Sequence, residues 1–144
     1  MTWRESRRLA LSLGVAVVIA ATCSATDDWN RGLEAFKKKD YAAAATEFEA
    51  VVQRAPDYPG GYYMLGLTQR AQGKASQAVG NLRKAVELDA ATPLYKVELA
   101  NTLVQAGQYQ EAFSLLRALD AGSLPANLKT PYVLAFAKAA SEVG

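Results

Sequence analysis

Small and apolar residues recur along the chain at intervals of 34 residues. The matching columns are Gly32, Gly66 and Ala100; Ala44, Ala78 and Ala112; Phe48, Leu82 and Leu116; and Val51, Ala85 and Leu119. An interval of this length indicates one supersecondary unit that occurs several times. We therefore predict three units, residues 25–58, 59–92 and 93–126, in a domain over residues 26–126.

Each unit is predicted to contain two antiparallel helices. In the second unit, Ala78, Leu82 and Ala85 recur after four and three residues, which is the spacing of one face of a helix. Gly73 precedes this run and suits the left-handed turn that ends a helix. We expect Gly66 to face Ala78, because small residues let two helix backbones approach closely.

Polar residues and prolines mark where the helices are expected to begin. Asp40 is placed to cap the second helix of the first unit. Pro56 and Pro59 separate the first two units, and Pro93 opens the third. The acidic residues in 26–28 also favour a helix start at that point.

The three units resemble the tetratricopeptide repeat family, whose pattern combines an aromatic residue, Leu-Gly, Tyr, two Ala, a second aromatic residue and Pro. The positions that carry the resemblance are Gly32, Asp40, Tyr41, Ala44, Phe48 and Pro56 in the first unit; Tyr62, Leu65, Gly66, Gly73, Ala78, Leu82 and Ala85 in the second; and Leu99, Ala100, Leu103, Gly107, Tyr109, Ala112 and Leu116 in the third. The chain departs from the pattern at Asp28, Arg31 and Ala90.

The resemblance implies an all-α fold, a right-handed superhelix of antiparallel helix pairs. A different array of α-hairpins is the alternative fold.

Residues 127–144 read as a further helix that covers the third unit, with Thr130 as its cap and Pro131 in its first turn. The exposed side of a terminal helix should be polar, yet apolar side chains spread around this one: Val133, Leu134 and Phe136. Gly144 also falls where a turn between helices is expected. This segment is therefore either a capping helix, which docks on a partner or on a second copy, or a truncated fourth repeat.

The N-terminal segment has the pattern of a secretory signal. Residues 9–21 are largely apolar, no charge occurs in residues 9–26, and three arginines precede them: Arg4, Arg7 and Arg8. We interpret residues 1–25 as a signal peptide or membrane anchor. We expect the domain to be exported, either into the bacterial periplasm or anchored on the extracytoplasmic side of the membrane.

Three kinds of processing are compatible with this segment. The chain can be cleaved after Ala25, or it can retain residues 1–25 as an uncleaved anchor. The third alternative makes it a lipoprotein modified at Cys23, because residues 20–23 loosely resemble the lipobox of bacterial lipoproteins.

Family resemblance also implies a concave groove lined by the first helix of each unit. We call these residues the predicted groove: Trp29, Leu33, Phe36, Lys37, Tyr63, Leu67, Arg70, Val97, Asn101, Val104 and Gln105. Mostly apolar and aromatic residues suit a short apolar segment of another protein. The alternative is that several of them pack against neighbouring helices.

One subclass of the family clamps the C-terminal carboxylate of chaperones with Lys, Asn and Arg. The corresponding positions here are Trp29, Leu33, Met64, Leu94 and Glu98. Because none of these residues is a Lys, Asn or Arg, and Glu98 would repel a carboxylate, we do not expect this binding mode.

The charge and the residue composition argue against nucleic-acid binding, catalysis and metal binding. The 144 residues include 16 Lys or Arg, 14 Asp or Glu, one Cys and no His, so the net charge of +2 gives no basic field for nucleic acid. Without His, the usual catalytic base and zinc ligand are missing. We expect no enzyme activity, no metal and no cofactor.

The basic run in residues 37–39 lies beside acidic Glu34 and Asp40, which is typical of a solvated helix end. The function that best fits the sequence is a protein-interaction scaffold of the cell envelope that binds a partner segment in the groove. The alternative is a structural module that self-associates through its last helix, or a part of a longer array.

Overall fold

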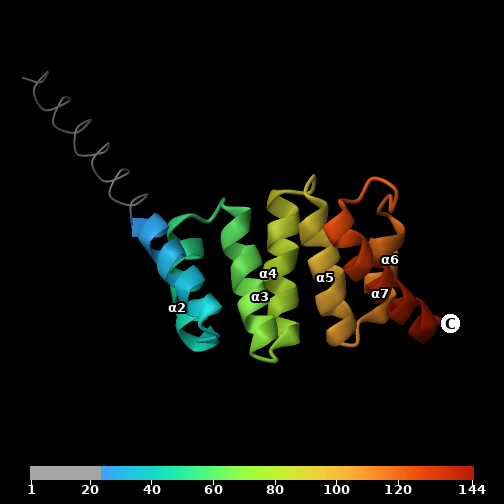
Figure 1. Ribbon diagram of the computed structural model, residues 1–144, viewed down its shortest axis with the longest axis horizontal. Helices are drawn as coiled ribbons and strands as arrows, with labels where there is room; N and C mark the ends of the chain where they lie inside the picture. Colours follow the sequence, from blue (N-terminus) through green and yellow to red (C-terminus); the bar gives the residue numbers. More distant parts are fainter. Residues whose placement is uncertain (1–23) are drawn as a thin grey trace, which may run out of the picture.

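The computed structural model describes residues 24–144, which are helical with no strand among them (Figure 1). A first helix covers residues 24–37. The helices that follow are α2 (Tyr41–Arg54), α3 (Pro59–Ala71), α4 (Ala75–Leu88), α5 (Pro93–Gln105), α6 (Tyr109–Arg117) and α7 (Ala126–Val143). The expected all-α solenoid of antiparallel helix pairs is confirmed.

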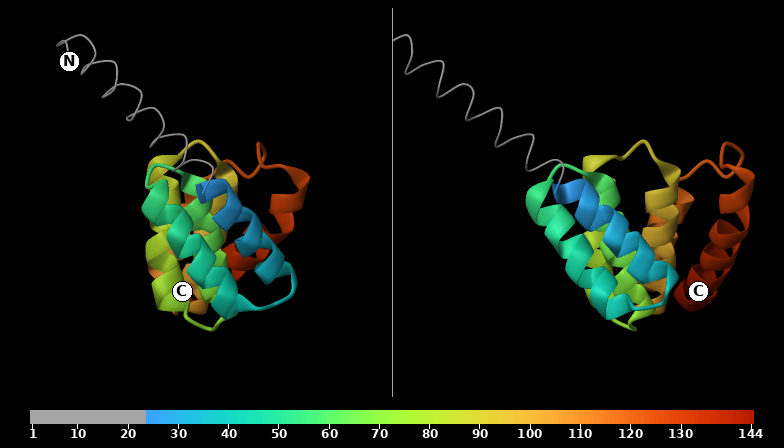
Figure 2. Two further views of the ribbon diagram at one scale, coloured as in Figure 1. Left: turned by 90° about the vertical axis from the view of Figure 1, so that its left-hand side faces the viewer. Right: turned by 60° about the vertical axis from the view of Figure 1, so that its left-hand side comes forward.

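The helices stand side by side along the long axis of the molecule (Figure 1). The first helix and α2 form one end, seen nearest the viewer in the left panel of Figure 2, and α6 and α7 form the other. Among the labelled helices, contacts join chain neighbours, and α7 additionally reaches α5. Each pair is therefore supported by the pairs beside it, as in other repeat arrays.

The turn that closes each helix pair has the same backbone geometry. Lys39, Gly73 and Gly107, spaced by 34 residues, have φ values of 62°, 77° and 75°. In each turn the next N–H donates to a carbonyl five residues back: Asp40 to Ala35 at 2.9 Å, Lys74 to Gln69 at 2.9 Å and Gln108 to Leu103 at 2.8 Å. This is the Schellman motif, in which a left-handed residue ends a helix.

Small residues allow the two helices of a pair to cross closely, as expected. A Cβ atom on Gly66 would lie 2.7 Å from Leu82 Cγ and 3.3 Å from the carbonyl oxygen of Ala78. The equivalent Cβ on Gly32 would lie 2.7 Å from Phe48 Cε1. Phe48 and Leu82 are fully buried, so these glycines make room for core side chains.

Three of the expected helix starts are confirmed. The Asp40 carboxylate accepts a hydrogen bond from the Ala43 N–H at 3.1 Å, and α3 and α5 begin at Pro59 and Pro93. The expected start in residues 26–28 is wrong, because the chain is already helical at residue 24.

The expected start of α7 at Thr130 is also wrong. The helix begins at Ala126, so Pro131 lies inside it and removes one backbone donor from its second turn. Burial of Leu124 and Leu128 explains the earlier start, since the chain removes apolar surface from water there. On the opposite side, Val133 and Leu134 are 58% and 65% exposed.

Cys23 and nearly all of the predicted signal or anchor segment, residues 1–25, lie outside the described residues. Within residues 24–144, none of the helices combines the length and hydropathy that a membrane crossing requires.

Candidate partner-binding face

The first helices of successive pairs form a continuous row through side-chain contacts. Leu33 and Phe36 of the first helix share an apolar cluster with Leu65 of α3. Between α3 and α5, the rings of Tyr63 and Tyr95 lie 5.2 Å apart. The residues of the predicted groove come from the adjacent helices of this row.

At the N-terminal end of the row, the aromatic residues pack within the first helix pair. The partly buried ring of Trp29 lies 5.6 Å from Phe48 and 5.4 Å from Tyr58, in both cases edge-on. Phe36 lies 5.5 Å from Tyr41. Trp29 and Phe36 therefore stabilise the first pair, with only part of their surface left for a partner.

Lys37 is exposed and forms an ion pair with Glu34, with 3.0 Å between Nζ and Oε1. The hydrogen bond and the charge of Lys37 lower the pKa of Glu34 below its ordinary value. Because both side chains are largely in water, this pair contributes little to stability and leaves a polar border at this end of the groove.

The middle of the row contains two half-buried tyrosines. Burial is the main cause that raises the pKa of Tyr63 to about 12, and the nearby charge of Glu98 adds to it. Burial also raises the pKa of Tyr95. Both phenols are therefore neutral at physiological pH and offer ring surface together with a hydroxyl group that donates and accepts hydrogen bonds.

Arg70 of α3 is held by Glu98 of α5. Arg70 Nη1 lies 2.7 Å from Glu98 Oε2 and 3.4 Å from Thr102 Oγ1. The Arg70 side chain is 24% exposed and that of Glu98 is 17% exposed. The only cation of the predicted groove on α3 is thus neutralised by a neighbour, so it is not free to bind a partner carboxylate.

The α5 residues of the predicted groove differ in exposure. Val97 is completely buried, which corrects its expected role: it is a core residue with no surface for a partner. Val104 is partly buried and packs on two core clusters, whereas Gln105 is exposed. Asn101 of α5, like Leu67 of α3, is partly exposed. Both side chains remain available at the surface.

The tetratricopeptide repeat family model matches residues 63–124. This part of the chain is a tetratricopeptide repeat region. The bounds of the three predicted units are not fixed by this match and stay a prediction.

Solved structures share the fold of this chain at low sequence identity. The TPR2B domain of yeast Sti1, in its pHsp70 complex, is 21% identical with a TM-score of 0.76, covering 83% of this chain and 98% of that domain. The Yersinia enterocolitica type III secretion chaperone SycD, in complex with a peptide of the translocator YopD, is 17% identical with a TM-score of 0.73, covering 83% and 94%.

A T3SS complex from Aeromonas hydrophila is 18% identical with a TM-score of 0.77, covering 85% of this chain and 84% of the matched one. No curated protein matches the chain.

An ionic cluster around one buried carboxylate was not anticipated from the sequence. Asp28 is buried, and its carboxylate pairs with Arg31 and, at 2.6 Å, with Arg54 of α2. An acidic residue in a column where the family has an aromatic one, followed by Arg31, was the available signal. The partner on α2 lies 26 residues away and could not be inferred.

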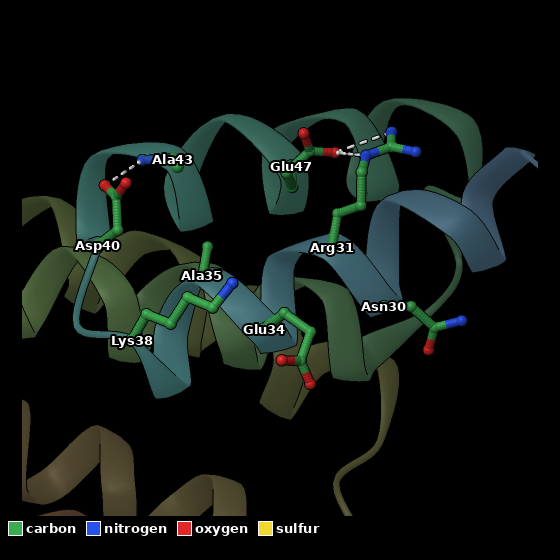
Figure 3. Close-up of a pocket in the computed structure, with 8 residues that line it drawn as sticks. All are labelled: Asn30, Arg31, Glu34, Ala35, Lys38, Asp40, Ala43 and Glu47. Atoms are coloured by element: carbon green, nitrogen blue, oxygen red, sulfur yellow. Dashed lines mark hydrogen bonds and ion pairs between the residues drawn. The ribbon is translucent and has the colours of Figure 1, made fainter.

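The end of the repeat array also carries a cleft that the sequence did not reveal. The first helix and α2 border a hollow of about 470 Å³, which we call the end cleft (Figure 3). Its lining residues are Asn30, Arg31, Glu34, Ala35, Lys38, Asp40, Ala43 and Glu47. Arg31 and Glu47 join across it at 2.9 Å. Despite these carboxylates, residues 24–144 contain no acidic, His or Cys cluster suited to a metal ion.

Proposed function

We propose that this protein is a non-enzymatic scaffold of the cell envelope that holds a segment of another protein in the predicted groove. The observation that carries the proposal is the centre of the row of first helices. There the rings of Tyr63 and Tyr95 contact each other, and the same two helices carry the partly exposed side chains of Leu67 and Asn101. Aromatic surface with a few polar groups is typical of sites that bind peptide segments.

Two solved structures of the same fold support the binding of a protein segment. One is a pHsp70 complex, and the other holds a peptide of a translocator. The electrostatics of this chain favour a different ligand chemistry. Because Arg70 already pairs with Glu98, the centre of the groove has no free charge from that pair. We therefore propose that the bound segment is apolar or aromatic, and that a terminal carboxylate is not its main feature.

The experiment is affinity capture from envelope extracts, with the full-length chain as bait. The test variant Asn101→Arg places a long, charged side chain on the partly exposed part of α5. The matched control is Gln53→Arg, which adds the same group to an exposed position of α2. Trp29 and Phe36 are less suitable, because their removal would also weaken the first helix pair.

We expect a partner that the unmodified bait and Gln53→Arg retain equally and that Asn101→Arg retains at least tenfold less. Equal retention by all three baits would show that the partner binds elsewhere. The captured partner is then cut into peptides, and the peptide that competes for binding identifies the segment.

Export is part of this proposal and rests on the sequence pattern of residues 1–25. Intact mass of the chain from its native host distinguishes three products: a chain that begins at residue 26, a chain with lipid on Cys23, and an uncleaved chain. A reporter that is active only outside the cytoplasm, fused after Gly144, tests the location. An inactive reporter would contradict export.

A further inference from the structure

The outer side of α7, at one end of the helix array, is an apolar face that is left open to solvent (Figures 1 and 2). Val133 and Leu134 are 58% and 65% exposed, and Ala137, one turn further along the same side, is exposed too. We call these three residues the α7 face. We propose that the α7 face binds an amphipathic helix of another protein, which pairs with α7 as a second helix pairs with a first.

The place of α7 in the array is that of a first helix. It contacts α6, the second helix of the preceding pair, as α5 contacts α4 and α3 contacts α2. Thr68 of α3, Thr102 of α5 and Ala139 of α7 are each fully buried, at intervals of 34 and 37 residues. The interval of 37 residues also separates Gly107 from Gly144, which have φ values of 75° and 65°. Both observations align α7 with α5 at an offset of 37 residues.

In this alignment the α7 face is the side that a second helix covers in the preceding pairs. Ala137 corresponds to Ala100 and, one unit earlier, to Gly66. Ala100 is fully buried and packs in one cluster with Leu116 of α6. Gly66 stands so close to α4 that an added Cβ would lie 3.3 Å from a carbonyl oxygen of that helix. Ala137 alone among these equivalent positions has no helix against it within residues 24–144.

The second helices of the chain indicate which helix fits such a face. Each has an alanine followed, four residues later, by a large apolar residue, and all six side chains are fully buried: Ala44 and Phe48, Ala78 and Leu82, Ala112 and Leu116. The small residue permits a close crossing, and the large one fills the space beside it. We therefore expect the partner helix to have Ala or Gly at the crossing, Leu or Phe four residues further, and polar residues on its opposite side.

A second copy of the chain is a less favourable source of this helix. Its α2, α4 and α6 already bury their apolar sides within their own pairs, so releasing one of them would open that pair. A helix that is exposed in another protein has no such cost. The binding is also separate from the predicted groove, whose residues all precede α7.

The probe for the test is a synthetic peptide of residues 40–55, which contains α2 with its cap and presents Ala44 and Phe48. A hydrocarbon staple joins residues 42 and 46, both exposed in α2, so that the peptide is helical before it binds. The labelled peptide is titrated with the full-length chain in a non-ionic detergent, and fluorescence anisotropy gives the Kd.

The decisive variant is Ala137→Leu. It enlarges the apolar surface of α7 but prevents a close crossing, so it should weaken binding of the peptide by about tenfold or more. Leu134→Gln removes apolar contact and should also raise the Kd. The matched control is Ala71→Leu, the same change at an exposed position of α3, which should leave the Kd unchanged. Circular dichroism checks that each variant is folded.

Four results would overturn the proposal. Failure of the stapled peptide to bind the wild-type chain would show that the α7 face does not accept a second helix. Tighter binding by Ala137→Leu would indicate unspecific adhesion to apolar surface. Equal binding by Ala137→Leu and the wild-type chain would place the peptide elsewhere, and a loss in Asn101→Arg would then place it in the predicted groove. Wild-type dimers that the peptide dissociates would identify a second copy as the occupant.

Discussion

Gly66 of α3 stands directly against Leu82 of α4, and a Cβ atom at residue 66 would lie only 2.7 Å from Leu82 Cγ. Leu82 is fully buried and cannot move aside without disturbing the core. Gly66→Ala is therefore expected to lower the free energy of unfolding by about 1–3 kcal/mol, the usual cost of an overpacked core. Urea denaturation followed by circular dichroism measures this change.

The control for this prediction is Gly80→Ala on α4. A Cβ atom at residue 80 would meet nothing within 4 Å, so only helix propensity changes. This substitution should raise the free energy of unfolding by about 0.5–1 kcal/mol. Equal effects of the two substitutions would show that the close crossing at Gly66 is unimportant.

Lys39 occupies the left-handed turn position that glycine occupies at residues 73 and 107. A residue with a Cβ is strained at its φ of 62°, whereas glycine is not. Lys39→Gly should raise the free energy of unfolding by up to about 1 kcal/mol, after the added flexibility of the unfolded chain is subtracted. Gly73→Ala should act in the opposite direction. Thermal unfolding of both variants tests the pair, and a loss of stability in Lys39→Gly would contradict the prediction.

The buried Asp28 predicts an order of effects. Asp28→Ala removes the buried group and leaves Arg31 and Arg54, which are exposed enough to be hydrated, so a loss of about 1–3 kcal/mol is expected. The double variant Arg31→Ala with Arg54→Ala leaves the buried carboxylate without these cations and should lose more than Asp28→Ala does. Urea denaturation gives the order, and the reverse order would show that Asp28 is not the buried member.

Tyr63 predicts a loss of stability at high pH. Its pKa is raised from 10.0 to about 12, chiefly by burial. Between these two values the unfolded chain releases the phenol proton while the folded chain retains it, so the unfolded state binds fewer protons. The free energy of unfolding therefore receives its full contribution from Tyr63 below pH 10 and falls as the pH rises towards 12.

Urea midpoints at pH 9, 10 and 11 measure this dependence. Tyr63→Phe cannot ionise and should show a shallower fall than the wild-type chain, with a remaining slope from Tyr95, whose pKa is also raised. Identical slopes in the two proteins would remove Tyr63 as the cause.

Local sequence features predicted the helix pairs because they act over short distances. The Asp40 cap and the prolines at residues 59 and 93 are each set by neighbouring residues, and the interval of 34 residues shows that the same local pattern recurs. The start of α7 was not predictable in the same way. It depends on burial of Leu124 and Leu128 in the folded chain, which outweighs the local preference of Pro131.

The candidate site was predicted less completely. Family positions identified the helices of the groove but not the direction of every side chain, so Val97 was placed at the surface although it is buried. The role of Asp28 depends on Arg54, and the end cleft requires two helices to be set side by side. Such features follow from packing between segments, which a pattern along one segment does not contain.

The chain of contacts from each helix to its neighbours has a consequence for how the molecule opens. α2 and α7 are connected only through the helices between them. Unfolding of one terminal helix pair therefore removes only the contacts between that pair and the next one. Amide protons should therefore exchange with solvent fastest at the two ends and slowest in α4 and α5. Unfolding should therefore begin at the two ends of the array, and the central helices should be the last to separate.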